Sequence, residues 1–109
     1  MEKSEVMSDI QEEIKKEIEN HPVILFMKGS KLMPHCGFSA RVVDVLNQHG
    51  IEYETRDVLK DDALREGIKE FSNWPTLPQL YIEGKFIGGC DIVLQLHEEG
   101  KLEAMLRRS

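Results

Sequence analysis

Apolar residues recur at every fourth position near the start of the chain, among glutamates and lysines. This spacing predicts an amphipathic helix with one buried stripe, formed by Val6, Ile10, Ile14 and Ile18. The first residue of the helix stays open, because Ser8 and Gln11 suit a capping box while a helix that already runs from Ser4 fits equally well. The segment Asn20-His21-Pro22 should end the helix.

The next segments predict a strand, a helix and a second strand. The continuous apolar run from Val23 to Met27 is typical of a strand buried on both faces, which favours a parallel sheet. After the polar loop 29–35, residues Ser39 to His49 have the pattern of a helix that points Val42, Val43 and Leu46 inward. Alternation from Tyr53 to Val58 predicts a parallel strand reached by a right-handed crossover.

A further helix and a hairpin follow. Asp61 or Asp62 can cap a helix that ends near Asn73. Residues Gln79 to Ile82 and Lys85 to Ile87 read as short strands, and the Glu-Gly pair between them fits a tight antiparallel turn.

The end of the chain predicts two helices, one capped by Asp91 and running to His97, and one amphipathic from Lys101 to Arg107. The order of elements is β-α-β-α-β-β-α with a helix added at each end. It predicts an α/β fold with a four-stranded mixed sheet flanked by helices.

Length, composition and charge exclude several classes of protein. The 109 residues should form one domain, with residues 1–20 as a leading helix and residues 21–109 as the core. A formal net charge of -6 argues against binding to a nucleic-acid backbone. No apolar run approaches the roughly 20 residues that cross a bilayer. The first seventeen residues have neither a signal-peptide core nor a transit-peptide composition, so we expect a cytoplasmic protein.

Cys36 is the candidate reactive residue. It lies where a loop enters a helix, among backbone N–H groups without partners and near the positive end of the helix dipole. Such positions favour the thiolate, and Lys28 at the end of the preceding strand would add a positive charge. The alternative is a small buried residue, the common role of a free cysteine.

Ser39 stands where a Cys-x-x-Cys pair would have its second sulfur. Cys36 then has two plausible roles, forming a mixed disulfide with an external thiol such as glutathione or donating its thiolate to a metal centre. A [2Fe–2S] cluster generally takes four thiolates, so two chains and two external thiols would be required. Zinc is disfavoured, because the four histidines lack the close pairing of a structural zinc site.

Five short motifs together carry a family resemblance: Lys28-Gly29, Cys36-Gly37-Phe38-Ser39, Asn73-Trp74-Pro75-Thr76, Pro78 after Leu77, and Gly88-Gly89-Cys90-Asp91. In this order and spacing they resemble the monothiol glutaredoxins of the CGFS type. The resemblance covers nearly the whole chain and implies a thioredoxin-like fold.

The resemblance also implies a glutathione site beside Cys36. Lys28 and Arg65 would pair with the glycine carboxylate of glutathione. The segment Thr76-Leu77-Pro78, where the family holds a cis proline, would present its backbone to the tripeptide. Cys90 and Asp91, at the start of a helix, would meet the γ-glutamyl group.

Three residues have open roles. Cys90 either forms a disulfide with Cys36 under oxidation or is a half-buried small residue, which we favour. Trp74 either packs as core, which we favour, or borders the glutathione site. His35 either supports the thiolate or faces solvent, which we favour. Leu77 replaces an aromatic residue common in the family, with little expected effect because the implied contact uses backbone atoms.

The leading functional hypothesis is a cluster carrier. Two chains and two glutathiones would hold a [2Fe–2S] cluster through Cys36. The protein would be a homodimer with the cluster and a monomer without it. The cluster would serve for transfer to apo iron–sulfur proteins or for iron sensing. The alternative is a glutathione-dependent oxidoreductase that removes glutathione from protein thiols by attack of Cys36. The resemblance also implies a BolA-like protein as a regulatory partner.

Overall fold

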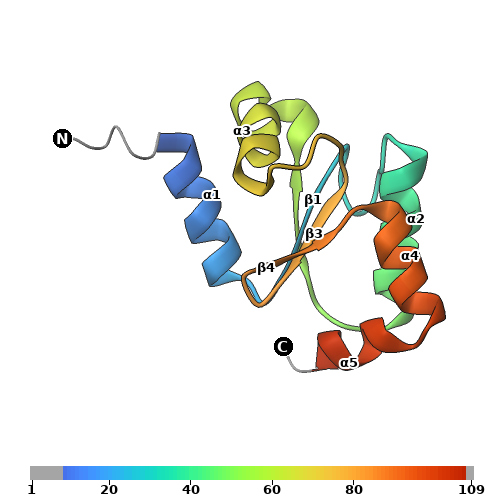
Figure 1. Cartoon of the computed structure of the whole chain (residues 1–109). Helices are drawn as coiled ribbons and strands as arrows, with labels where there is room; N and C mark the ends of the chain where they lie inside the picture. Colours follow the sequence, from blue (N-terminus) through green and yellow to red (C-terminus); the bar gives the residue numbers. More distant parts are fainter. Residues whose placement is uncertain (1–8, 108–109) are drawn as a thin grey trace.

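The computed structural model describes residues 9–107 and contains one four-stranded sheet with helices on both faces (Figure 1). Its elements in chain order are α1 (Asp9–Asn20), β1 (Val23–Met27), α2 (Gly37–Gln48), β2 (Glu54–Asp57), the 3-10 helix η2 (Val58–Lys60), α3 (Asp62–Ser72), β3 (Gln79–Ile82), β4 (Lys85–Gly88), α4 (Cys90–Glu98) and α5 (Lys101–Arg107). None of these helices has the length and apolar character needed to cross a membrane.

Strand β1 lies inside the sheet, whose order is β2-β1-β3-β4. It pairs in parallel with β2 and antiparallel with β3, which in turn forms an antiparallel hairpin with β4. The predicted mixed sheet is therefore confirmed. All five residues of β1 are buried, because helices cover it on both sides.

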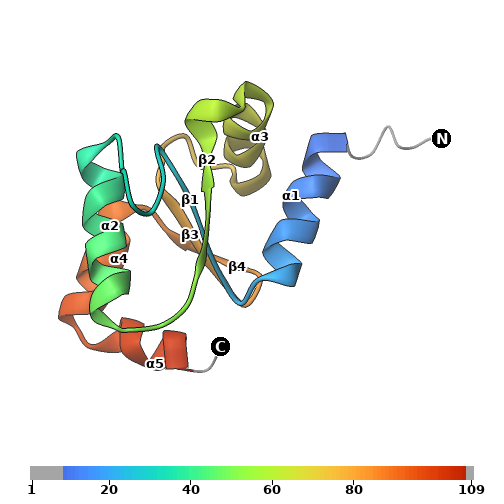
Figure 2. The same cartoon turned by 180° about the vertical axis from the view of Figure 1, so that it is seen from behind.

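The two faces of the sheet carry separate cores. Val23, Leu25 and Met27 of β1 point to the face covered by α2, α4 and α5, while Ile24 and Phe26 point to the face covered by α1 and α3. Figure 2 shows the same division from behind, with α1 and α3 on one side of the sheet and α2, α4 and α5 opposite. Because successive side chains of a strand point to opposite faces of the sheet, β1 contributes to both apolar cores.

Helix α1 packs through Ile14 and Ile18, both buried as the fourfold spacing predicts. It lies close to α3, since a Cβ atom at Gly67 would stand 3.0 Å from Ile10 and 3.1 Å from Ile14. Val6, the first residue of the predicted stripe, lies outside the described residues, as does the predicted start of the helix.

Several boundaries differ from the prediction. Helix α2 begins at Gly37, two residues before Ser39, because Cys36 has the extended backbone of an N-cap. Asp61 caps α3 as expected by accepting a hydrogen bond from the N–H of Leu64. Asp91 does not cap α4: Gly89 is the N-cap, since the extended backbone needed there falls before Cys90.

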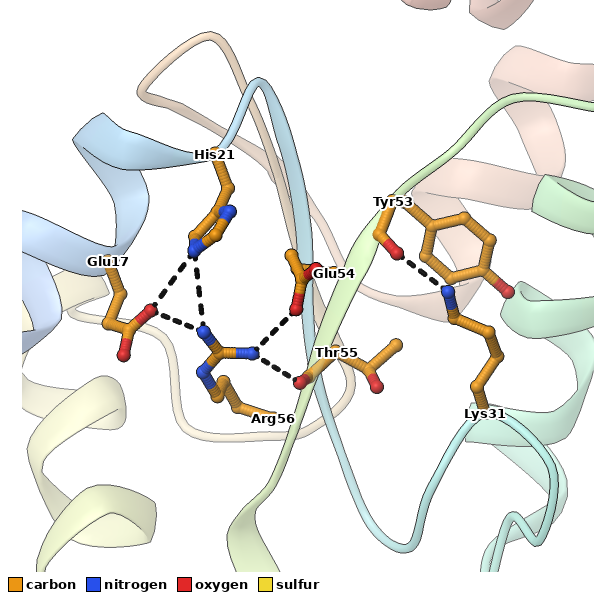
Figure 3. A network of polar contacts seen from close by, with 7 residues as sticks. All are labelled: Glu17, His21, Lys31, Tyr53, Glu54, Thr55 and Arg56. Atoms are coloured by element: carbon orange, nitrogen blue, oxygen red, sulfur yellow. Dashed lines mark hydrogen bonds and ion pairs between the residues drawn. The ribbon is translucent and has the colours of Figure 1, made fainter.

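Arg56 fastens the edge strand β2 to the end of α1 (Figure 3). Its guanidinium donates to Glu17 at 2.6 Å, to Glu54 at 3.0 Å and to the carbonyl of Thr55 at 2.8 Å. The His21 ring lies against the same carboxylate of Glu17 at 3.4 Å. The bond to Thr55 gives a backbone carbonyl of this edge strand a partner.

Lys31 holds the loop that leads to Cys36 against the segment before β2. Its ammonium donates to the carbonyl of Tyr53 at 2.7 Å and lies 4.1 Å from the centre of the Tyr53 ring (Figure 3). A cation over an aromatic face is an attractive contact in addition to the hydrogen bond. The loop is thus fixed at a point five residues before the reactive cysteine.

Candidate functional site

Cys36 is a partly exposed free thiol at the N-terminus of α2. Hydrogen bonds from the backbone N–H of Ser39 and, to a smaller extent, of Phe38 lower the pKa of this thiol, and the charge of Lys28 acts in the same direction. Desolvation opposes them without reversing the shift. The thiolate predicted at this helix start therefore has the donors that stabilise it.

Ser39 has a structural part in the site as well. It is fully buried, and its hydroxyl accepts a hydrogen bond from the N–H of Lys28 at 3.2 Å. The same hydroxyl contributes to the lowered pKa of Cys36. The residue in the position of a second cysteine thus joins the end of β1 to the first turn of α2, a role the sequence did not indicate.

Gly29 lets the loop before Cys36 fold back on itself. Its φ is +93°, and its N–H donates to the carboxylate of Asp57 at 2.9 Å. The N–H of His35 then returns to the carbonyl of Lys28 at 3.0 Å. A Cβ atom at Gly29 would lie 2.5 Å from the carbonyl oxygen of Met33, so the folded loop admits no side chain there.

A groove of about 220 Å³ runs beside the start of α2. Its lining comes from three segments that are distant in sequence: Phe38, then Trp74, Thr76, Leu77 and Pro78, then Gly89, Cys90, Asp91 and Ile92. Five of the residues predicted to contact glutathione therefore come together. The Leu77-Pro78 peptide bond is cis, as the resemblance implies.

A larger hollow of about 520 Å³ lies elsewhere, beside Tyr53 and Lys31. Neither cysteine lines it. Cys36 does not line the smaller groove either, but Phe38, two residues after it, does, and the charge of Cys36 acts on Cys90 in the groove wall. Because residues from the starts of α2 and α4 meet in the smaller groove, we place the candidate site there.

Lys28 and Arg65 do not line the groove. The charge of Lys28 nevertheless acts on the Cys36 thiol, which places the two side chains near each other. Arg65 lies between Asp62, at 3.3 Å, and Glu66, at 3.5 Å. Their pairing with a glutathione carboxylate stays a prediction.

Trp74 is not a core residue, and the favoured interpretation of it is wrong. Its side chain is 36% exposed and lines the groove, while its ring packs against Phe86 with the ring centres 5.8 Å apart. Asn73, in the left-handed conformation at the end of α3, turns the chain so that Trp74 leaves the interior. Phe38 and Ile92 also border the groove, and only the position of Phe38 within the CGFS motif could have indicated this.

Cys90 is a buried free thiol that lines the groove. Burial, and then the nearby carboxylate of Asp91, raise the pKa of this thiol. These features agree with the favoured interpretation of Cys90 as a small residue in the protein interior. His35 is exposed, as expected.

The two thiols should therefore differ in their pH dependence of alkylation. At neutral pH Cys36 is expected to react with iodoacetamide much faster than Cys90, because its pKa is lowered and that of Cys90 is raised. The measurement is the rate at each cysteine against pH, located by mass spectrometry of peptides. In Ser39→Ala the pH at which alkylation of Cys36 is half-maximal should rise only slightly, since the Ser39 hydroxyl is the weakest of the contacts that lower the pKa of Cys36. Coinciding profiles for the two cysteines would contradict this assignment.

Comparison with protein families matches residues 23–87 to the family model described as Glutaredoxin. A ycf64-like monothiol glutaredoxin of Synechocystis is 58% identical over 84 residues, which cover 77% of this chain and 78% of the relative. A Rickettsia prowazekii protein described as "Probable monothiol glutaredoxin 2" is 52% identical over 107 residues, covering 98% of this chain and 96% of the relative. Monothiol glutaredoxin-S11 of rice is 54% identical over 83% of this chain, and the match spans only 18% of that longer protein.

Solved structures show the same fold. Reduced apo GrxS14 from poplar superimposes with a TM-score of 0.81 at 41% identity, over 94% of both chains. A buckwheat glutaredoxin in complex with glutathione gives 0.84 at 28% identity, over 98% of this chain and 96% of the other. The holo form of glutaredoxin C1 from Populus tremula x tremuloides gives 0.83 at 28% identity, over 97% and 93%.

The fold, the single reactive cysteine followed by Ser39, and the cis proline beside it agree with these matches. The chain has the glutaredoxin form of the thioredoxin-like fold, and it belongs to the monothiol glutaredoxin family.

Proposed function

We propose that this protein binds glutathione in the groove beside Cys36. Two such chains with two glutathiones would then hold a [2Fe–2S] cluster, for transfer to apo iron–sulfur proteins or for iron sensing. The observation that carries the proposal is the ligand count. Each chain offers one accessible thiol with a lowered pKa, and residues 9–107 contain no group of three or more His, Cys, Asp or Glu that could hold a metal ion.

The groove suits a thiol tripeptide. It has an apolar wall of Trp74 and Ile92, and backbone at the start of α4 that favours a carboxylate. Asp91 is exposed at that helix start, where its carboxylate can meet an amine. A relative of the same fold has been solved with glutathione bound, which supports this choice of ligand.

The ligand count also explains why a second copy is required. A [2Fe–2S] cluster generally takes four thiolates, and two Cys36 thiolates with two glutathione thiolates complete that set. The buried Cys90 is the less suitable ligand, because its pKa is raised. A related glutaredoxin is known in a holo form.

The surface around Cys36 supports contact with a second copy. Leu32 is 90% exposed, Met33 65% and Phe38 57%, and all three lie within four residues of Cys36. Exposed apolar side chains that lie together in this way are typical of a surface that contacts another protein. A BolA-like protein on the same surface stays a further proposal, based on family resemblance alone.

The lowered pKa of Cys36 also favours a second candidate function, removal of glutathione from protein thiols. The Cys36 thiolate would attack the glutathione sulfur of a mixed disulfide and release the protein thiolate. A second glutathione thiolate would then attack the Cys36–glutathione disulfide, which forms oxidised glutathione and restores Cys36. Ser39 cannot resolve this intermediate, so the external thiol is obligatory.

Anaerobic reconstitution tests the leading proposal. The protein is incubated with iron and sulfide, with and without glutathione as the only small thiol, and then examined by absorption and size-exclusion chromatography. Visible cluster absorption in a dimer peak is expected only with glutathione. A cluster that co-elutes with monomer, or that forms equally well without glutathione, would refute the shared-ligand arrangement.

A further inference from the structure

Gln79 is a polar side chain with no solvent exposure, located directly after the cis Pro78 at the start of β3. Its amide nitrogen donates to the carbonyl of Trp74 at 3.1 Å and to the carbonyl of Thr76 at 3.2 Å. Its amide oxygen accepts from the hydroxyl of Tyr81 at 3.1 Å. A buried amide with all of these bonds satisfied is strongly fixed in position.

These bonds hold the loop that forms one wall of the groove. Trp74, Thr76, Leu77 and Pro78 all line the groove, whereas Gln79 does not. The loop is also held from its other side, because the N–H of Trp74 donates to the hydroxyl of Ser72 at 3.1 Å and to the carbonyl of Lys69 at 3.2 Å. Both peptide groups of Trp74 are therefore tied to neighbouring structure.

Tyr81 holds the oxygen end of the Gln79 amide. Its ring is 2% exposed and packs edge-on against Phe26 and Phe71. Burial raises the pKa of Tyr81 to about 12, so the phenol keeps its proton. Carbonyl oxygens only accept, so the amide nitrogen must face the two loop carbonyls while the amide oxygen faces the phenol.

We propose that Gln79, held in place by Tyr81, is a positioning residue that sets the shape of the loop 74–78 and thereby the affinity of the groove for glutathione. The inference rests on the proposed glutathione binding. Gln79 acts through the loop and does not touch the ligand. Without its two donors, the carbonyls of Trp74 and Thr76 lose their partners, and the loop loses the contacts that define its conformation.

The test uses Gln79→Glu, which keeps the size of the side chain and exchanges the amide for a carboxyl. At neutral pH the carboxylate would face two carbonyl oxygens, and the dissociation constant for glutathione, measured by calorimetry, is expected to rise at least tenfold. The emission of Trp74, the only tryptophan in the chain, should change even without ligand. Acidification protonates the carboxyl and supplies one O–H donor, so emission and affinity should partly recover in Gln79→Glu and not in the original protein.

Two further variants separate positioning from general stability. Tyr81→Phe keeps the buried ring and removes only the hydroxyl, which donates to Gln79 and also forms a hydrogen bond with Ser72. A smaller shift in the same direction is therefore expected even if Gln79→Glu fails to fold. Leu102→Ala, in the fully buried part of α5 away from the groove, should lower the unfolding temperature and leave both glutathione affinity and Trp74 emission unchanged.

Unchanged affinity and emission in a folded Gln79→Glu and in Tyr81→Phe would overturn the inference. The inference would also be overturned if Leu102→Ala weakened glutathione binding as strongly as Gln79→Glu does. If the original protein shows no glutathione binding, the proposed function fails by itself. The emission of Trp74 and its recovery at low pH would still decide whether Gln79 positions the loop.

Discussion

Cys36→Ser is expected to abolish assembly of the [2Fe–2S] cluster and to leave the protein monomeric, whereas Cys90→Ser should retain both cluster and dimer. A serine hydroxyl is not deprotonated at neutral pH and is a poor ligand for iron in place of thiolate. Cys36 is the accessible thiol with a lowered pKa, while Cys90 is buried with a raised one. The two substitutions remove the same atom from two places, one beside the groove and one in its wall.

The measurement is visible absorption per chain after anaerobic reconstitution, together with the elution volume. The expected result is absorption at background for Cys36→Ser and close to the original protein for Cys90→Ser. Cys36→Ser should unfold at a temperature near that of the original protein, because Cys36 is partly exposed. Cys90→Ser should unfold at a lower temperature and still be folded at room temperature, because its hydroxyl is buried in an apolar cluster. Retained cluster absorption in Cys36→Ser, or its loss in Cys90→Ser alone, would contradict the assignment of the ligand.

Gly29→Ala is expected to reduce the free energy of unfolding by about 2–4 kcal/mol. A side chain at positive φ contributes roughly 1 kcal/mol of this. Overpacking adds about 1–3 kcal/mol, because the Cβ atom would stand 2.5 Å from the carbonyl oxygen of Met33 and 2.6 Å from the nitrogen of His35. Both contacts are with backbone, which cannot rotate away as a side chain could.

The matched control is Gly84→Ala, in the hairpin between β3 and β4. Gly84 has a similar φ of +82°, and nothing lies within 4 Å of a Cβ atom built there. Gly84→Ala should therefore reduce the free energy of unfolding by only roughly 1 kcal/mol, which is the cost of a side chain at this backbone conformation. Urea denaturation of the two variants measures the difference, and equal losses would show that crowding of the Cys36 loop has no effect.

Much of the fold was predictable because its signals are local. The uninterrupted apolar run of β1 predicts a strand covered on both sides, and the spacing of Ile14 and Ile18 predicts the face of α1 that is buried. The cap of α4 was placed wrongly on Asp91. A favourable capping side chain gives no information on which residue has the extended backbone, and here Gly89 adopts it first.

The site was only partly predictable, because its supporting contacts join distant segments. Cys36 follows from its place at a helix start, and the residues of the groove follow from family motifs. The bond that the N–H of Lys28 donates to Ser39 depends on how β1 and α2 pack together. The bond that Gln79 donates to the carbonyl of Trp74 depends on the conformation of the loop between α3 and β3. The prediction for Trp74 is wrong for a different reason, since a large aromatic side chain suits a core and a groove wall equally.

The groove receives the first turns of two helices, with Phe38 from α2 on one side and Cys90 from α4 on the other. Each helix start carries about half a positive charge from its unpaired N–H groups. Together they amount to roughly one fixed charge that neither titrates nor depends on any single side chain. A protein of formal net charge -6 can in this way attract an anion at one place. The attraction should vary little with pH and weaken only moderately in salt, since it acts at contact distance.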